Sequence, residues 1–396
     1  MRFPEFSGEW KMCTIGELIT KVGSGVTPRG GEAVYKTEGH PFVRSQNVGL
    51  GNLLLDDIAF IDEETHLRQK NTELQFNDVL LNITGASIGR SALVDKQIVG
   101  GNVNQHVCII RTKENLVPSF ICSFLLSNYG QRQIDSFQAG GNRQGLNFEQ
   151  IKSIKITIPS KDEQIKIAKL LRAIDERIAT QNKIIEKLQS LIKGLNDHIL
   201  KNIEGDQVCF ADLGEAYGGL SGKSGDDFGC GDPFITYMNV YQNTYISEND
   251  YELVQIAPDE KQNSVQYGDA LFTLSSETPE EVGMGAVYLG KSQKLYLNSF
   301  CFGVHFHGNR VLPQYIAHFI SSTSFRKAIY PLAQGSTRFN LQKQDFMRMK
   351  FVLPSLEEQK RIATALDALY NHLANEKLLT EQYLLLKQYL LQQMFI

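Results

Sequence analysis

The sequence lacks several features that would each assign it to a familiar class. Its longest apolar runs, such as ALFTL at 270–274, are far shorter than the roughly 20 residues that a membrane-spanning helix needs. The first residues, MRFPEFSGEW, do not have the pattern of a secretory signal. The six cysteines form no C-x-x-C pair, which argues against a zinc or disulfide framework. These absences predict a cytoplasmic protein with reduced thiols and no membrane contact.

The chain also lacks an excess of positive charge. The formal net charge is −4, and residues 1–159 are neutral whereas residues 204–354 carry −6. Proteins that bind nucleic acid usually carry a basic surface, because contacts to phosphate dominate their affinity. Charge alone therefore argues against DNA binding. A chain of this composition would need local basic patches, or a partner that supplies the phosphate contacts.

Catalytic and metal-binding motifs are missing as well. AYGGLSGKS at 216–224 resembles a phosphate-binding loop, but Tyr217 stands where that motif requires a glycine. FGCGDPF at 228–234 resembles a methyltransferase loop, but no Asn-Pro-Pro-Tyr motif follows it. His305 and His307 could share one face of a strand, but no third ligand stands at a useful spacing. We therefore expect a binding or organising protein that has neither catalytic nor metal-binding residues.

What the sequence does contain is a repeat of about half its length. IPSKDEQIKIAKLL begins at Ile158, and LPSLEEQKRIATAL begins 195 residues later at Leu353. Farther upstream, FVRSQNV at 42–48 pairs with FITYMNV at 234–240. The offset of 195 also aligns three earlier positions: Gly140 with Gly335, Arg143 with Arg338 and Leu146 with Leu341. Two copies are too few for a solenoid, so the repeat predicts two related globular domains.

Each copy combines short β-rich runs, turn residues and a short helix, and then ends in a long helix. This pattern predicts an α+β protein in which two similar mixed α/β domains are separated by two long antiparallel coiled-coil helices in a pseudo-two-fold repeat. The expected domains are residues 1–159 and 204–354. The expected helices are residues 160–203 and 355–396.

Both long helices begin with the same capping signal. The Ser-x-x-Glu pattern at 160–163 and at 355–358 is a capping box, in which the serine hydroxyl accepts a hydrogen bond from the glutamate amide. Gln164 and Gln359 follow these boxes directly. They have two interpretations: solvated polar residues next to a cap, or part of a docking surface for a partner.

The helices also carry a heptad pattern. Apolar residues recur in alternating steps of four and three along 167–199, and along 362–390 after one shift of register, which predicts a coiled-coil seam. At 1.5 Å per residue, a helix of about 44 residues would span roughly 65 Å. The pair could act only as a rigid spacer. Apolar residues off the seam favour a second role in docking the helices of another protein, and they include Ile165, Leu170, Leu378 and Leu385.

The loops of both halves are rich in the side chains that read base edges and phosphates. Candidate DNA-contacting residues of the first half are Thr27, Arg29, Arg44, Ser45, Asn47, Asn82, Thr84, Arg90, Asn104, Gln105 and Arg143. Those of the second half are Lys223, Tyr237, Asn239, Ser275, Asn298 and Arg338.

Some of these candidates have a structural alternative. The matched arginines Arg143 and Arg338 could either brace a loop or contact DNA. The matched asparagines Asn47 and Asn239 could either hold a turn or contact DNA. Arg90, like Arg44, has no basic counterpart in the second half, which suits two domains that read different DNA sequences.

The two I/L-P-S-x-x-E-Q-x-x-I-A stretches resemble the specificity subunit of Type I restriction-modification enzymes, as do EWKMCTIGELITKVGSGVTP and NDVLLNITGASIGRSALV. The resemblance covers essentially the whole chain. It implies that each globular domain is a target-recognition domain for one half of a split double-stranded DNA site, and that the helices are the conserved spacer. It also implies two modification (methyltransferase) subunits and a restriction (helicase-nuclease) subunit as partners. S-adenosylmethionine, ATP and Mg²⁺ would belong to those partners and not to this chain.

Two other classes of function remain to be tested. A coiled-coil scaffold with two protein- or glycan-binding ends would show no selectivity for DNA when its partners are bound. A methyltransferase in its own right would bind S-adenosylmethionine as a purified chain.

Overall fold

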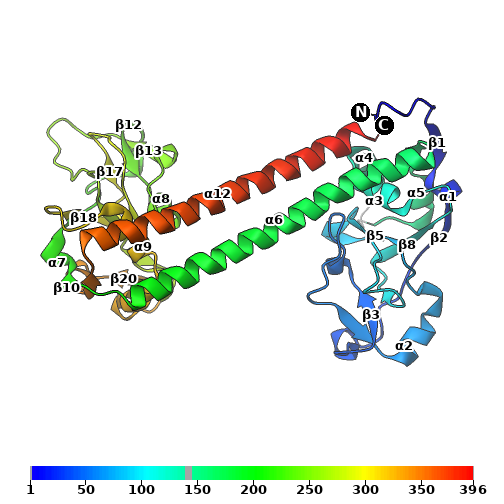
Figure 1. Ribbon diagram of the computed structural model, residues 1–396, viewed down its shortest axis with the longest axis horizontal. Coiled ribbons are helices and arrows are strands. Elements are labelled where there is room, and N and C mark those ends of the chain that lie inside the picture. The colour runs from blue at the N-terminus through cyan, green and yellow to red at the C-terminus, as the bar shows by residue number, and fades with distance from the viewer. Residues whose placement is uncertain (1, 139–144, 396) are drawn as a thin grey trace. The chain divides into compact units, whose positions relative to one another are not determined.

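The computed structural model describes residues 2–138 and 145–395 (Figure 1). The chain forms two compact units, which are described separately below. Unit 1 comprises Met1–Lys183 together with Leu378–Ile396, and unit 2 comprises Ile184–Lys377. Both units combine small β-sheets with helices, and both contain part of each long helix. Among the described residues, no helix is both long and apolar enough to cross a membrane.

Unit 1 is built around a four-stranded antiparallel sheet in the order β2-β8-β5-β6. A three-stranded sheet, β4-β3-β7, and the pair β1-β9 complete its strands. The strands are β1 (Lys11–Thr14), β2 (Ile19–Ser24), β3 (His40–Val43), β4 (Ala59–Ile61), β5 (Val79–Asn82), β6 (Ser91–Leu93), β7 (Asn102–Val103), β8 (Val107–Thr112) and β9 (Lys155–Ile158). The helices are α1 (Ile15–Leu18), α2 (Glu63–Arg68), α3 (Pro118–Leu126), α4 (Asn128–Ser136), α5 (Phe148–Ser153) and the first part of α6 (Lys161–Lys201).

Unit 2 repeats this plan with the sheets β11-β18-β14-β16, β13-β12-β17 and β10-β21, and it adds β15-β20-β19. Its strands are β10 (Asp206–Cys209), β11 (Gly214–Gly218), β12 (Phe228–Ile235), β13 (Tyr251–Val254), β14 (Ala270–Thr273), β15 (Ser275–Ser276), β16 (Gly285–Val287), β17 (Tyr296–Leu297), β18 (Cys301–Phe306), β19 (Ala333–Gln334), β20 (Phe339–Leu341) and β21 (Lys350–Leu353). Its helices are α7 (Phe210–Leu213), α8 (Tyr237–Gln242), α9 (Pro313–Ile320), α10 (Thr323–Ile329), α11 (Lys343–Met347) and the first part of α12 (Leu356–Gln393).

The matching strand orders confirm the repeat and the expected α+β class. In both units the central strand of the small sheet pairs antiparallel on one side and parallel on the other, β3 with β7 and β12 with β17. The strand that precedes each long helix closes the unit by pairing with the first strand of its own half.

The two long helices have 41 and 38 residues. Each unit contains the start of one helix and the end of the other, so the helices run in opposite directions through both units (Figure 1). In unit 1 the seam residues Ile167 and Leu171 of α6 share a core with Leu390 of α12 and with Met394, which directly follows that helix. In unit 2 the start of α12 enters the core around Leu366. The heptad pattern therefore predicted the buried face of α6 and of the first part of α12 correctly. The predicted shift of register in α12 is wrong, because Leu379 and Leu386 are exposed whereas Thr380 is buried.

The caps form as expected, with Ser160 Oγ accepting from the amide of Glu163 at 3.4 Å and Ser355 Oγ accepting from that of Glu358 at 3.3 Å. The Glu163 carboxylate is buried, and both of its oxygens accept from the Arg2 guanidinium at 2.8 Å. The segment before β1 is thereby fastened to the first turn of α6.

Unit 2 attaches α12 to its globular part through a buried histidine. His318 of α9 lies 2.7 Å from an Asp367 oxygen through Nε2, and Tyr245 donates to the same oxygen at 2.6 Å. The ring of His318 stacks on that of Tyr370, with the centroids 5.3 Å apart. Burial lowers the pKa of His318, although the neighbouring carboxylate of Asp367 opposes that shift.

A histidine with a lowered pKa resists protonation in the folded state, whereas the unfolded chain takes up the proton at a pH of about 6.5. The unfolded state then binds more protons, so unit 2 should lose stability as the pH falls below about 6.5. We expect His318→Gln to reduce this loss, measured as the urea midpoint of unfolding at pH 8, 7, 6 and 5. His198→Gln on the exposed side of α6 is the control, and an equal reduction in both variants would contradict the assignment.

Candidate DNA-binding surfaces

In unit 1, several candidate residues come together where β5 and β7 end. Asn82 donates from Nδ2 to the carbonyl of Ser45 at 2.8 Å, and the backbone N–H of Asn104 donates to the carbonyl of Val43 at 3.0 Å. Thr84 Oγ1 lies 2.5 Å from Nδ1 of His106. The loops that follow β3, β5 and β7 thus form one polar cluster. Because Asn82 is fully buried, it holds the loops together and is not exposed to DNA.

Asn47 also has a structural role. Its buried Nδ2 donates to Leu54 O and to an Asp57 oxygen, both at 2.9 Å, and its Oδ1 accepts from the Arg44 amide at 2.9 Å. The half-buried guanidinium of Arg44 donates to Asp57 O at 2.6 Å and lies 5.4 Å from the ring of Tyr35. The turn-holding alternative therefore describes Asn47, and Arg44 is already engaged within the unit.

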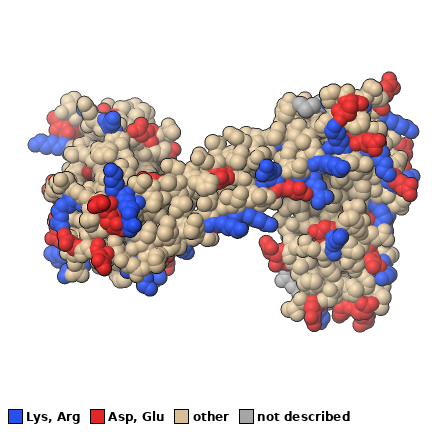
Figure 2. Space-filling model, in the orientation of Figure 1, with Lys and Arg blue, Asp and Glu red and all other residues tan. Residues whose placement is uncertain are grey.

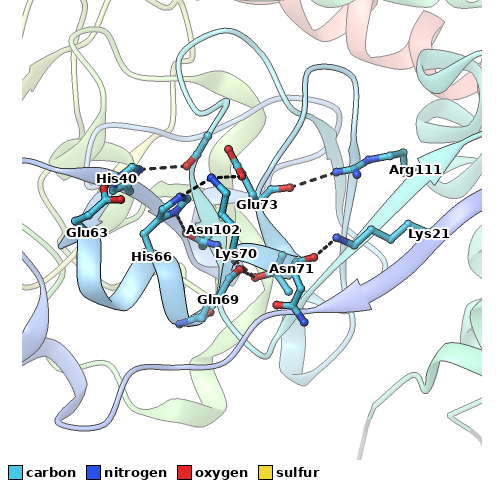
Figure 3. Close-up of polar contacts among 12 residues, drawn as sticks. Lys21, His40, Glu63, His66, Gln69, Lys70, Asn71, Glu73, Asn102 and Arg111 are labelled. Atoms are coloured by element: carbon cyan, nitrogen blue, oxygen red, sulfur yellow. Dashed lines mark hydrogen bonds and ion pairs between the residues drawn. The ribbon is translucent and has the colours of Figure 1, made fainter.

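The loop that carries Thr27 and Arg29 is supported by α2 and the turn after it. Gln69 Oε1 accepts from the Val26 amide at 3.2 Å. Behind it, the ring of His66 stacks on His40 with centroids 3.8 Å apart, and Asn102 donates to Gln69 O at 3.0 Å (Figure 3).

Gly25 precedes this loop and has no substitute, because a Cβ there would lie 1.7 Å from the carbonyl oxygen of Val103. The loop is therefore held close to the end of β7. Arg29 is exposed at its tip, and Thr27 is half-buried.

Arg90 and Gln105 are exposed at the same edge of the sheet. Arg90 directly precedes β6, and its carbonyl accepts from the Asn82 amide at 2.9 Å. Gln105 lies next to His106, with 3.3 Å between the side-chain nitrogens. Arg143 falls outside the described residues.

Unit 2 builds the corresponding edge from different side chains. The half-buried Tyr237 donates from its hydroxyl to Ser275 O at 2.9 Å, and burial raises the pKa of that hydroxyl. Asn298 accepts from the Phe300 amide at 2.9 Å, just as Asn104 accepts from the His106 amide at 3.0 Å. Arg338 is exposed nearby.

Three candidates of unit 2 are used inside the fold. Asn239 is fully buried and donates to Ser247 O at 2.8 Å, so it holds a turn as Asn47 does. Ser275 is buried. Lys223 donates to Gln255 O at 2.6 Å and forms a 2.5 Å ion pair with Glu260, which leaves its side chain 8% exposed. Lys223, a DNA-contacting candidate from the sequence, therefore has its charge already paired within the unit.

Two of the expected partner-binding residues also need correction. Gln164 and Gln359 are buried, and their amides bond to the backbone of their own units. Ile165 and Leu170 are half-buried, whereas Leu378 and Leu385 of α12 are 53% and 64% exposed. An apolar surface on α12 therefore remains available.

Sequence reasoning missed His106 and Phe300, which occupy matching positions directly before β8 and β18. Lys and Arg side chains are interspersed with Asp and Glu on the visible face of the molecule (Figure 2). Among residues 2–138 and 145–395, no group of three or more acidic, histidine or cysteine side chains is arranged to hold a metal ion.

The chain belongs to the family described as the Type I restriction modification DNA specificity domain, whose model matches residues 7–190 and 223–382. It is therefore a DNA sequence-specificity subunit, a class of subunit without catalytic activity of its own.

Among curated relatives, the EcoKI specificity subunit of Escherichia coli (strain K12) is 23% identical over 91% of this chain and 82% of its own length. The putative MjaX specificity subunit of Methanocaldococcus jannaschii is 21% identical over 92% of this chain and 88% of its own length.

Two solved structures share the fold. The S subunit of a Type I restriction-modification system from M. genitalium has a TM-score of 0.56 at 14% identity and covers 100% of this chain and 97% of its own. The HsdS subunit from Thermoanaerobacter tengcongensis has a TM-score of 0.53 at 15% identity, with coverages of 98% and 96%. The comparisons leave the scaffold alternative without support.

Proposed function

We propose that units 1 and 2 each read one half of a bipartite site in double-stranded DNA, and that the two long helices set the interval between the halves. The observation that carries this proposal is the duplicated loop cluster. Matching positions are built alike, as at Asn104 and Asn298, but they display different side chains, as at His106 and Phe300. Two loop clusters with similar backbones and different exposed side chains are suited to contact two different DNA sequences.

We further propose that two methyltransferase subunits and the restriction subunits assemble on this chain. The exposed leucines of α12 support this, because a contiguous apolar surface in water usually marks an interface. Next to them in unit 1, a cavity of about 660 Å³ is lined by Leu126, Ile178 and Leu384, with Asp175 and Lys387 at its polar side. In this proposal S-adenosylmethionine, ATP and Mg²⁺ bind to the partners, which also supply phosphate contacts that the mixed surface charge does not.

The test uses the full chain in complex with its methyltransferase partner and a library of randomised duplexes. Binding selection should recover two defined segments at a constant interval. Arg90→Ala should reduce base discrimination in one segment by about 1–3 kcal/mol and leave the other unchanged. Lys96→Ala is the control, because Lys96 is also exposed but lies after the end of β6, whereas Arg90 lies before its start. Recovery of no bipartite motif, or an equal loss in both segments, would contradict the proposal.

A further inference from the structure

An exposed aromatic ring lies beside an arginine at the DNA-facing edge proposed for unit 2. Phe300 is 53% exposed, which is unusual for an apolar ring, and it follows the polar residues Asn298 and Ser299. The guanidinium carbon of Arg338 lies 5.4 Å from the centre of the Phe300 ring. This distance is typical of a cation–π contact, which holds an arginine side chain in a defined orientation.

The backbone of Phe300 is fixed on both sides. Its amide donates to Asn298 Oδ1 at 2.9 Å, and its carbonyl accepts from the Leu274 amide at 2.8 Å. The ring is thus displayed from a rigid turn between β17 and β18. A group held in place before binding loses little conformational entropy when it meets its ligand.

Arg338 is displayed by the hairpin between β19 and β20. Gly335 has a φ of 143°, and a Cβ there would lie 2.1 Å from the carbonyl oxygen of Arg338, so the tight turn requires glycine. The hairpin is joined to the rest of the site because Ser275 of β15 pairs with Asn340 of β20. The Leu274 amide holds the backbone of Phe300, and the next residue, Ser275, holds the hairpin that carries Arg338. Two adjacent residues therefore position both side chains of the cation–π pair.

The charge of Arg338 is available to a ligand. Within the described part of the chain it forms no salt bridge, and it is exposed. Arg326 of the same unit differs, because it donates to the carbonyls of Glu280, Val282 and Gly283 at 2.6 Å each. Arg338 therefore combines a fixed orientation with unused hydrogen-bond donors.

We propose that Phe300 and Arg338 together form a base-reading contact of unit 2. Arg338 donates to O6 and N7 of a guanine in the major groove, and the ring of Phe300 contacts the methyl group of a neighbouring thymine. Both pairings follow from the groups that these bases present in that groove. The inference rests on the proposed function and adds the determinant of one half-site.

Unit 1 differs at the position that matches Phe300. His106 lies 2.5 Å from Thr84 Oγ1 and has Gln105 beside it at 3.3 Å, so this edge offers polar groups in place of an apolar ring. The same frame can thus read different bases through one exchanged side chain.

The experiment repeats the duplex selection with four proteins in complex with the methyltransferase partner: wild type, Phe300→Ala, Arg338→Lys and Tyr267→Ala. Phe300→Ala should lose the preference for thymine at one position of one half-site. Arg338→Lys keeps the charge but not the paired donors, and it should lose about 10- to 100-fold of the preference for guanine at the adjacent position. The other half-site should stay unchanged in both variants.

Tyr267→Ala is the matched control. This tyrosine is 58% exposed, but it lies before the start of β14, whereas Leu274 and Ser275, which position the proposed site, lie after the end of β14. It should select the wild-type motif. If the wild type yields no bipartite motif, the proposed function itself fails. Suppose instead that the wild type yields a bipartite motif. If Phe300→Ala and Arg338→Lys then both select the wild-type motif, or both change the two half-sites alike, only the present inference is overturned. Melting curves identify any variant that fails to fold, and the other variant then decides.

Discussion

Replacement of Gln359 by leucine is expected to lower the free energy of unfolding of unit 2 by about 3–6 kcal/mol. The Gln359 side chain accepts from the Leu312 amide at 2.8 Å and donates to Arg310 O and Pro354 O at 2.9 Å each. Leucine fills a similar volume but leaves these three backbone groups without their partner, Pro354 O in a buried contact and the other two in half-buried ones. Each unsatisfied group costs about 1–3 kcal/mol, so three would cost about 3–9 kcal/mol, and because two of the contacts are only half-buried we expect no more than about 6 kcal/mol.

The measurement is the urea-induced unfolding of unit 2, followed by hydrogen exchange of the α9 amides. Gln189→Leu on the exposed side of α6 is the matched control and should change stability by less than about 0.5 kcal/mol. Gln359→Glu should be at least as damaging as the leucine variant, because a carboxylate would face two carbonyl oxygens. Equal stability of the Gln359 variants and the control would show that the glutamine is not a structural element.

Unit 1 provides an independent repeat of this test. Gln164 accepts from the Val117 amide at 2.9 Å and donates to Asn115 O and Pro159 O at 3.1 Å each. Gln164→Leu should therefore destabilise unit 1 as Gln359→Leu destabilises unit 2. The repeated Glu-Gln dipeptide is explained by this attachment of each long helix to the loop before α3 or α9.

The role of the two glutamines shows what the sequence could and could not reveal. The repeat appears as matching segments, and the caps and the α6 seam depend on residues close together along the chain. The structure confirms these three features. The partners of Gln164 lie as far as 49 residues upstream, and no periodicity indicates that contact. A polar residue near a helix start therefore suggested solvent or a partner, although tertiary packing buries it.

The same limit applies to the DNA-binding candidates. The residue types pointed to loops that the structure brings together in unit 1, around Asn82 and Thr84. It could not separate the exposed Arg90 from the buried Asn47, because that depends on which face of each loop the sheet covers. Phe300 was missed because apolar residues suggest a core. Its alignment with His106 in a polar loop was the available signal.

Arg111→Met is the second substitution with a large expected effect, about 3–5 kcal/mol of lost stability in unit 1. Arg111 of β8 donates to both oxygens of Asp78 at 2.7 Å through Nε and Nη2, and to Glu73 O at 3.2 Å. The Asp78 carboxylate is 1% exposed, so removal of the guanidinium leaves a buried charge without its counterion. The pair also raises the pKa of Arg111, mainly through the hydrogen bonds to Asp78.

Unit 2 has a tyrosine and a histidine at the corresponding carboxylate, in place of an arginine. Asp269 stands where Asp78 does, before the central strand, and it accepts from Tyr217 at 2.7 Å and lies 2.7 Å from Nδ1 of His305. Burial raises the pKa of Asp269, and the hydrogen bonds from Tyr217 and His305 offset this rise only in part. The bidentate arginine of unit 1 is thus the stronger anchor of the two.

A double variant separates the ion pair from its surroundings. Arg111→Met with Asp78→Asn removes both charges, and the asparagine can still accept from the Gln75 amide as Asp78 does at 2.8 Å. Because the double variant leaves no uncompensated buried charge, it should recover most of the stability lost in Arg111→Met. Arg132→Met, at an exposed position of α4, should behave like the wild type. If urea unfolding shows the double variant as unstable as the single one, the loss comes from the packing of the Arg111 stem and not from an uncompensated Asp78.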